Sequence, residues 1–86
     1  MTLEKYIKLR SAVYEYMIEQ DKPISLIDIQ EHIVSHHEGK FTKKMLHQFY
    51  LSRLLDELKL DGKITLAEAE HLFGEKGVYY KARKGS

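Results

Sequence analysis

The sequence contains no cysteine, a single proline and no long apolar run. Without cysteine, disulfide bonds and zinc sites built on thiolates are excluded. No run of apolar residues approaches the roughly 18 that are needed to cross a bilayer. The first ten residues, MTLEKYIKLR, place charges inside their apolar pattern, which is not typical of a signal peptide. We therefore expect a cytoplasmic protein.

The motifs of common catalytic sites are also missing. The sequence has no glycine-rich phosphate loop and no HExxH pattern. Because an enzyme of this length would be unusual, we expect no catalytic activity and no cofactor. His32 and His36 stand four residues apart, with Asp28 one turn earlier, and this spacing places two imidazoles within reach of one ion. We interpret them as surface histidines and expect no metal site.

Positive charge is not in excess over the whole chain. The 14 lysines and arginines nearly balance the 13 acids, and the net charge is +1. A DNA-binding domain needs positive charge concentrated in one place, so the total does not decide the question. With 43% hydrophobic and 31% charged residues, residues 1–86 have the composition of one globular domain.

A first helix is predicted over residues 3–20. Its main apolar stripe has the three-and-four spacing of a buried face and consists of Leu3, Tyr6, Leu9, Val13, Tyr16 and Met17. A second stripe of Ile7, Tyr14 and Ile18 lies about a quarter turn away. Since a helix with two apolar stripes buries more than one face, we expect a homodimer with these three residues at its interface.

A second helix is predicted to follow the segment DKPIS, where Pro23 ends the first helix. Ser25 and Asp28 have the spacing of a capping box, which favours a helix start at this point. The helix is expected to run to about His36 and to bury Leu26, Ile29 and Ile33.

A third helix is predicted over residues 43–60, with Thr42 as its N-cap and Gly62 in the left-handed position after its end. Its buried stripe is expected to hold Leu51, Leu54, Leu55 and Leu58. On a helical wheel, Met45, Leu46, Phe49 and Leu60 then fall on the outer half. Three explanations stay open: packing of Met45 and Phe49 against the second helix, a dimer interface, or a protein partner in place of DNA.

The C-terminal segment has two interpretations. Residues 65–73 contain good helix formers, but they also fit one strand of a hairpin that returns through residues 78–83. A register that places Phe73 opposite Val78 also pairs Glu70 with Lys81 and Glu68 with Arg83. Such charge pairs contribute about 0.2–1 kcal/mol each, so the hairpin is favoured.

The order is therefore helix, short extended segment, helix, loop, helix and hairpin. On the segments PISLIDIQEHI, LSRLLDELKLDGKI and GVYYKAR, the chain resembles the winged-helix DNA-binding superfamily of bacterial transcriptional regulators. The order is similar to the DNA-binding half of ferric-uptake-type and PadR-type repressors. The resemblance implies an α+β fold, a winged helix-turn-helix of three helices and a C-terminal β-hairpin.

For function, the resemblance implies a dimeric transcriptional regulator that inserts helix 43–60 into the major groove of double-stranded DNA. The positions carried over as DNA-binding combine base-reading side chains on the helix with lysines and arginines that neutralise phosphates. They are Lys40, Thr42, Lys43, Lys44, Gln48, Ser52, Arg53, Lys76, Lys81, Arg83 and Lys84. The alternative is a winged-helix module that binds a protein partner through Met45 and Phe49, without DNA.

Overall fold

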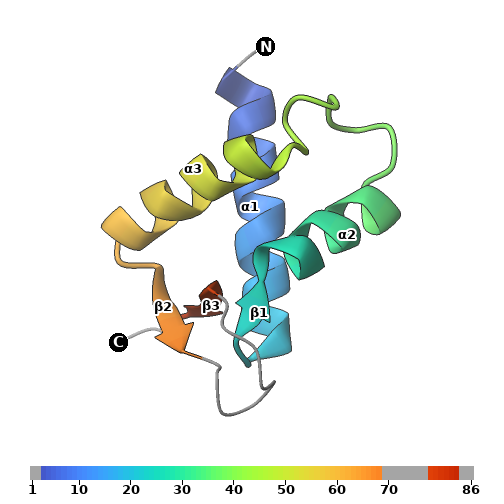
Figure 1. Cartoon of the computed structure of the whole chain (residues 1–86). Coiled ribbons are helices and arrows are strands. Elements are labelled where there is room, and N and C mark those ends of the chain that lie inside the picture. Colours follow the sequence, from blue (N-terminus) through green and yellow to red (C-terminus); the bar gives the residue numbers. More distant parts are fainter. Residues whose placement is uncertain (1–2, 69–77, 84–86) are drawn as a thin grey trace.

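The computed structural model describes residues 3–68 and 78–83. Their elements are α1 (Leu3–Gln20), β1 (Ile24–Ser25), α2 (Leu26–His36), α3 (Gln48–Leu60), β2 (Ile64–Glu68) and β3 (Val78–Ala82). Within this part of the chain, three helices accompany a three-stranded antiparallel sheet with strand order β1-β3-β2 (Figure 1). The predicted α+β class is confirmed, and the layout is consistent with a winged helix.

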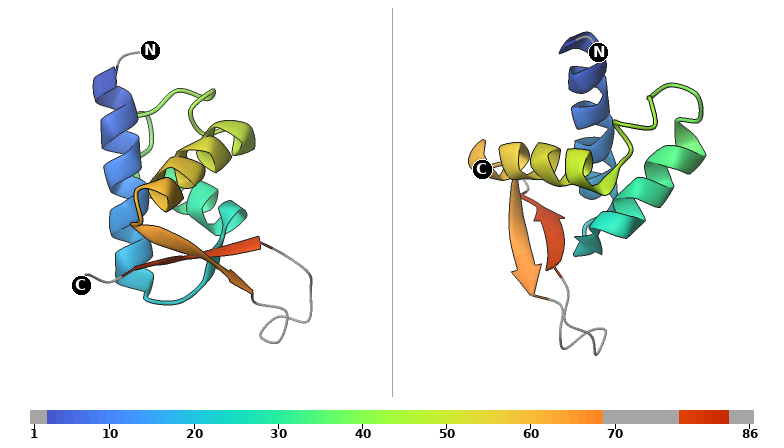
Figure 2. Two further views of the ribbon diagram at one scale, coloured as in Figure 1. Left: turned by 90° about the vertical axis from the view of Figure 1, so that its left-hand side faces the viewer. Right: turned by 45° about the horizontal axis from the view of Figure 1, so that its top comes forward.

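The helices lie on two sides of the core. α1 lies along one side, α2 and α3 lie on the other, and the sheet closes one end (Figure 2). The core between them is apolar throughout and includes Leu9, Val13, Met17, Ile29, Ile33 and the four leucines Leu51, Leu54, Leu55 and Leu58. None of the described helices combines the length and the apolar character that crossing a membrane requires.

α1 and α2 have the predicted bounds. α1 buries Leu9, Val13 and Met17, whereas Leu3 of the same predicted stripe is exposed. α2 begins with the predicted capping box: the Asp28 amide donates to Ser25 Oγ over 3.1 Å, and the Ser25 amide donates to the Asp28 carboxylate over 3.3 Å. Local side-chain chemistry therefore fixes where α2 begins, as the sequence indicates.

The predicted start of the third helix at residue 43 is wrong. Thr42 caps only one turn, in which its Oγ and its carbonyl oxygen both accept from the Met45 amide. The backbone then becomes extended at His47, the true N-cap of α3 (φ −70°, ψ 146°). The break turns Met45 into the core, where it is fully buried, and leaves Phe49 exposed. Burying a methionine side chain contributes about 1.5–3 kcal/mol, which offsets the helical hydrogen bonds that the break removes.

The far end of α3 is as predicted. Gly62 has φ 76°, which a residue without a Cβ adopts at no steric cost. Its amide donates to the Lys59 carbonyl, and the Lys63 amide donates to the Leu58 carbonyl. These two bonds form a Schellman motif, which satisfies the last carbonyls of the helix and turns the chain into β2.

The hairpin exists, but the predicted register is wrong. Val78 lies opposite Glu68, and Lys81 lies opposite Thr65, so the predicted pairs of Glu68 with Arg83 and Phe73 with Val78 do not form. The observed register places Ile64, Tyr80 and Ala82 on the sheet face that packs against the helices, where all three are buried. Burying this face outweighs the small contribution of charge pairs between strands. Residues 69–73, the rest of the segment with two interpretations, lie outside the described residues.

Candidate nucleic-acid interface

The segment from His37 to His47 joins α2 to α3 and is held by three anchors. Met45 is buried, and Thr42 closes the turn around it. Gln30 of α2 donates a hydrogen bond from its amide Nε2 to the Leu46 carbonyl over 2.7 Å. That carbonyl lies just before the break in the helix, so the Gln30 bond fixes the segment at the point where it turns into α3.

The lysines of this segment project into solvent. Lys40, Thr42, Lys43 and Lys44 are all exposed, and we call residues 40–44 the lysine loop. Within residues 3–68 and 78–83, none of its three lysines forms a salt bridge. The anchored backbone therefore carries unneutralised positive charge, which is the chemistry that attracts a phosphate backbone.

The first turn of α3 continues from the lysine loop. The Phe49 amide donates to His47 Nδ1 over 3.3 Å, so in the neutral ring the proton lies on Nε2. The rings of His47 and Phe49 are parallel within 2°, with centroids 5.9 Å apart. Gln48, Phe49 and Ser52 line an open pocket of about 240 Å³ together with His47 and with Leu26 of α2. Polar and apolar groups thus alternate around the exposed start of the helix.

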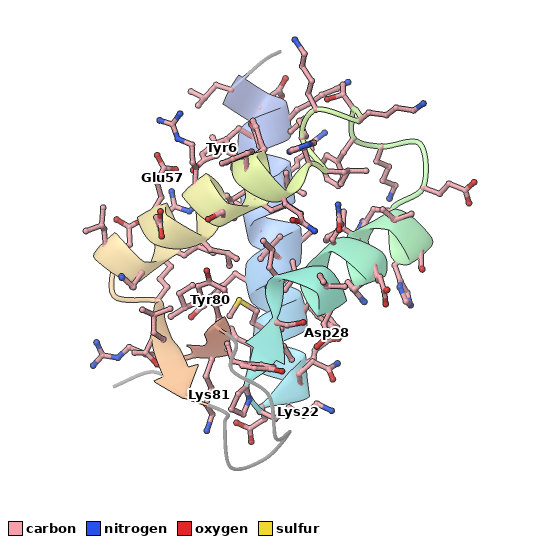
Figure 3. All side chains as sticks on the ribbon, in the orientation of Figure 1. Tyr6, Lys22, Asp28, Glu57, Tyr80 and Lys81 are labelled. Atoms are coloured by element: carbon pink, nitrogen blue, oxygen red, sulfur yellow. The ribbon has the colours of Figure 1, made fainter. Side chains whose placement is uncertain are left out.

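Arg53 lies on the other edge of the exposed face of α3. It borders a crevice with Tyr6, Tyr50, Leu54 and Glu57, and Figure 3 shows Tyr6 and Glu57 beside α3. The rings of Tyr6 and Tyr50 meet edge to face, with centroids 6.4 Å apart. Arg53 is exposed and carries its charge at the rim of this aromatic crevice.

The structure does not bring all the predicted DNA-binding residues together. Lys40, Thr42, Lys43, Lys44, Gln48, Ser52 and Arg53 gather around the lysine loop and the first half of α3. Lys81 lies at the sheet end of the molecule, away from this group (Figure 3), and Arg83 follows the end of β3, where its amide donates to Lys63. Lys76 and Lys84 lie outside the described residues.

Three histidines form a cluster of contacting rings beside the lysine loop. The His32 ring lies between Tyr16 of α1 and His36, with centroid distances of 3.8 and 4.2 Å. His37 meets His32 edge to face and also contacts Phe41 of the loop. No three histidine or acidic side chains of the described residues are arranged to hold a metal ion. The ring contacts join α1, α2 and the lysine loop.

Protonation of His32 is expected to destabilise the fold. Burial, and then the nearby His36 and His37, lower the pKa of His32 below its ordinary 6.5, against the opposing effect of Glu19. As pH falls through 6.5, the unfolded chain takes up a proton that the folded chain still resists, so stability is lost down to the lowered pKa. Urea unfolding at pH 7.5, 6.5 and 5.5 is expected to give decreasing midpoints, and His32→Phe is expected to flatten this decrease. An equal decrease in the variant would contradict the assignment.

The predicted dimer residues on α1 are only partly available. Tyr14 and Ile18 pack against the core of their own chain, and the Lys63 ammonium lies 5.4 Å from the centroid of the Tyr14 ring. Beside them, Arg10 of α1 forms a salt bridge with Asp61 at the end of α3. Ile7 alone is largely exposed, at 52%. The second stripe thus has an explanation within one chain, and the homodimer stays a prediction.

The outer face of α3 carries fewer apolar residues than predicted. Met45 is buried and Leu46 is half-buried, so Met45 is not accessible to the protein partner that the alternative interpretation supposed. Phe49 is 80% exposed in the first turn of α3, and Leu60 is 83% exposed at its end. The exposure of Phe49 contradicts its burial against the second helix, which the first of the three explanations supposed, and Ile27 and Val34 of α2 are themselves about half exposed.

Two residues of this interface have no signal in the sequence. His47 is the N-cap of α3, a position for which serine, threonine, aspartate or asparagine is usual. Gln30 acts on a carbonyl 16 residues away, and a single polar residue on a helix gives no indication of such a partner. Comparison of the chain with protein-family models, curated proteins and solved structures gives no match.

Proposed function

We propose that this chain is a small winged-helix protein that binds double-stranded DNA and regulates transcription. Its DNA-binding face consists of the lysine loop and the first half of α3. Lys40, Lys43 and Lys44 neutralise phosphates, while Gln48, Ser52 and Arg53 face base edges in the major groove. The observation that carries this proposal is the lysine loop. Its exposed charges belong to a segment whose backbone is anchored by Gln30, and the segment leads directly into the exposed start of α3.

The packing of Met45 removes one objection to this function. Three outward apolar residues near the start of the third helix would suit a protein partner better than a base-pair edge. With Met45 buried and Leu46 half-buried, Phe49 is the one such side chain left exposed in the segment from residue 42 to residue 53. A single apolar side chain among polar ones is compatible with contact to a thymine methyl group.

A salt series on short duplexes tests the proposal. With about three to four phosphates neutralised, log affinity is expected to fall linearly with log salt, with a slope near −3. Fluorescence anisotropy with the full chain measures the affinity at salt concentrations from about 50 to about 300 mM. Absent binding at the lowest salt, with the fold intact by circular dichroism, would overturn it.

A second candidate function is a module that binds a protein partner. The observation in its favour is the exposure of Phe49 and Leu60 on the outer side of α3, at 80% and 83%. Large apolar side chains on one surface often mark protein interaction sites. These two stand eleven residues apart, about 16 Å along the helix, so they form separate spots on α3. A folded chain that binds no duplex would favour this candidate.

A further inference from the structure

We propose that the pocket between α2 and α3 reads an A·T base pair, by receiving the thymine methyl group while Gln48 bonds the adenine. The pocket has a volume of about 240 Å³ and is lined by Leu26, His47, Gln48, Phe49 and Ser52. This inference rests on the proposed function and names the base pair that the same face selects.

The apolar wall of the pocket is held in place before any ligand arrives. The Phe49 amide donates to His47 Nδ1, which fixes the backbone that carries the Phe49 ring. This ring lies parallel to the His47 ring, and Leu26 supplies a half-buried aliphatic surface from the start of α2. Leu26 directly follows the N-cap Ser25, whose capping box fixes this end of α2. A methyl group therefore meets a preformed apolar wall.

The polar groups of the pocket fit the other half of the same base pair. Gln48 is exposed and carries an amide oxygen and an amide nitrogen, which match the N6 donor and N7 acceptor of adenine. In the major groove these adenine groups and the thymine methyl lie on one pair edge. A G·C pair offers no methyl group for Phe49, and its guanine presents two acceptors, O6 and N7, where adenine presents a donor and an acceptor.

Charge next to the pocket identifies a nucleic acid as its occupant. Lys43 and Lys44 precede His47 by four and three residues and form no salt bridge in the described part of the chain. Positive charge this close to the pocket along the chain suits the phosphates that flank a bound base pair. A protein side chain in the same pocket would gain no favourable interaction with these lysines unless it were acidic.

Thymine-to-uracil substitution tests the methyl contact, because it removes only the methyl group from a duplex. For the full chain, an A·T-rich duplex is expected to bind about fourfold more tightly than its uracil counterpart, as one buried methyl group predicts. Phe49→Ala is expected to abolish this difference. Leu60→Ala is the matched control, since Leu60 is equally exposed on the same helix but lies outside the pocket, and it is expected to keep the difference.

A separate measurement tests the contact between Gln48 and adenine. Replacing adenine by 7-deazaadenine removes the N7 acceptor, which is expected to weaken binding about tenfold in the unaltered chain and not at all in Gln48→Ala. Duplex binding that ignores both the methyl group and N7 would overturn this inference and leave the proposed function standing. Failure to bind any duplex would overturn both, and retention of the uracil effect in Phe49→Ala would also overturn the pocket assignment.

Discussion

Met45→Ala is expected to lower the free energy of unfolding by about 2–5 kcal/mol, the range for large-to-small changes in a packed core. Met45 is fully buried and belongs to the same cluster as Ile29, Ile33 and Leu51. Its loss leaves a cavity under the segment that carries the lysine loop. Because a small domain has about 5–15 kcal/mol of stability in total, this change removes a large part of it. Urea unfolding followed by circular dichroism measures the effect.

Phe49→Ala is the control for this prediction. The sequence pattern places Met45 and Phe49 on the same outer face, which would make the two changes equivalent. In the structure Phe49 is 80% exposed, so its replacement is expected to change stability by no more than about 0.5 kcal/mol. Equal stability of the two variants would show that the break at His47 is absent and that the third helix is continuous.

The Lys43→Ala, Lys44→Ala double variant is expected to lose most of its affinity for duplex DNA. Each phosphate contact contributes about 0.9 to the slope of log affinity against log salt, so the slope should become shallower by about 1.8. At 0.1 M salt this corresponds to a loss of roughly 60-fold, with the affinities converging towards 1 M. Both side chains are exposed, and the fold is expected to be unaffected. Anisotropy titrations at four salt concentrations measure the change.

A matched pair of lysines separates local contacts from overall charge. Lys22 and Lys81 are exposed and lie at the sheet end of the molecule, away from the lysine loop (Figure 3). The Lys22→Ala, Lys81→Ala variant has the same net charge as the first double variant but keeps the lysine loop. It is expected to retain the slope within about 0.3, since a lost contact would change it by 0.9. Equal losses in the two variants would mean that DNA is attracted by the whole surface, without a defined face.

The bounds of α1 and α2 were predictable because local rules set them. The apolar period marks the buried face of α1, Pro23 follows its end, and Ser25 and Asp28 cap α2 with their own side chains. The start of α3 was not predictable in this way. Helix propensity favours residues 43–47 as a helix, whereas the inward turn of Met45 depends on the core that it joins with residues of α2 and α3, which no local pattern contains.

The charged and polar residues of the candidate interface were predictable from the sequence, but the contacts between α2 and α3 that position them were not. Lys43, Lys44 and Gln48 stand out by residue type alone. The Gln30 bond to the Leu46 carbonyl and the closeness of Leu26 to Phe49 depend on how α2 crosses α3, which no local pattern contains. For the hairpin, charges suggested a register that burial of Tyr80 and Ile64 overruled, because the apolar face weighs more than the charge pairs.

The strand order has a consequence for synthesis on the ribosome. β3 occupies the middle of the sheet, and Ile24 of β1 pairs with Tyr80, far along the chain. Among the described strands, the two outer ones therefore have no hydrogen-bonding neighbour until residues 78–82 have left the exit tunnel. Until then the sheet cannot form, so the apolar faces of the helices that pack against it stay exposed to solvent, together with Ile24 and Ile64. Completion of the fold thus waits for the last strand, and a nascent chain stalled before it would be a natural target for chaperones.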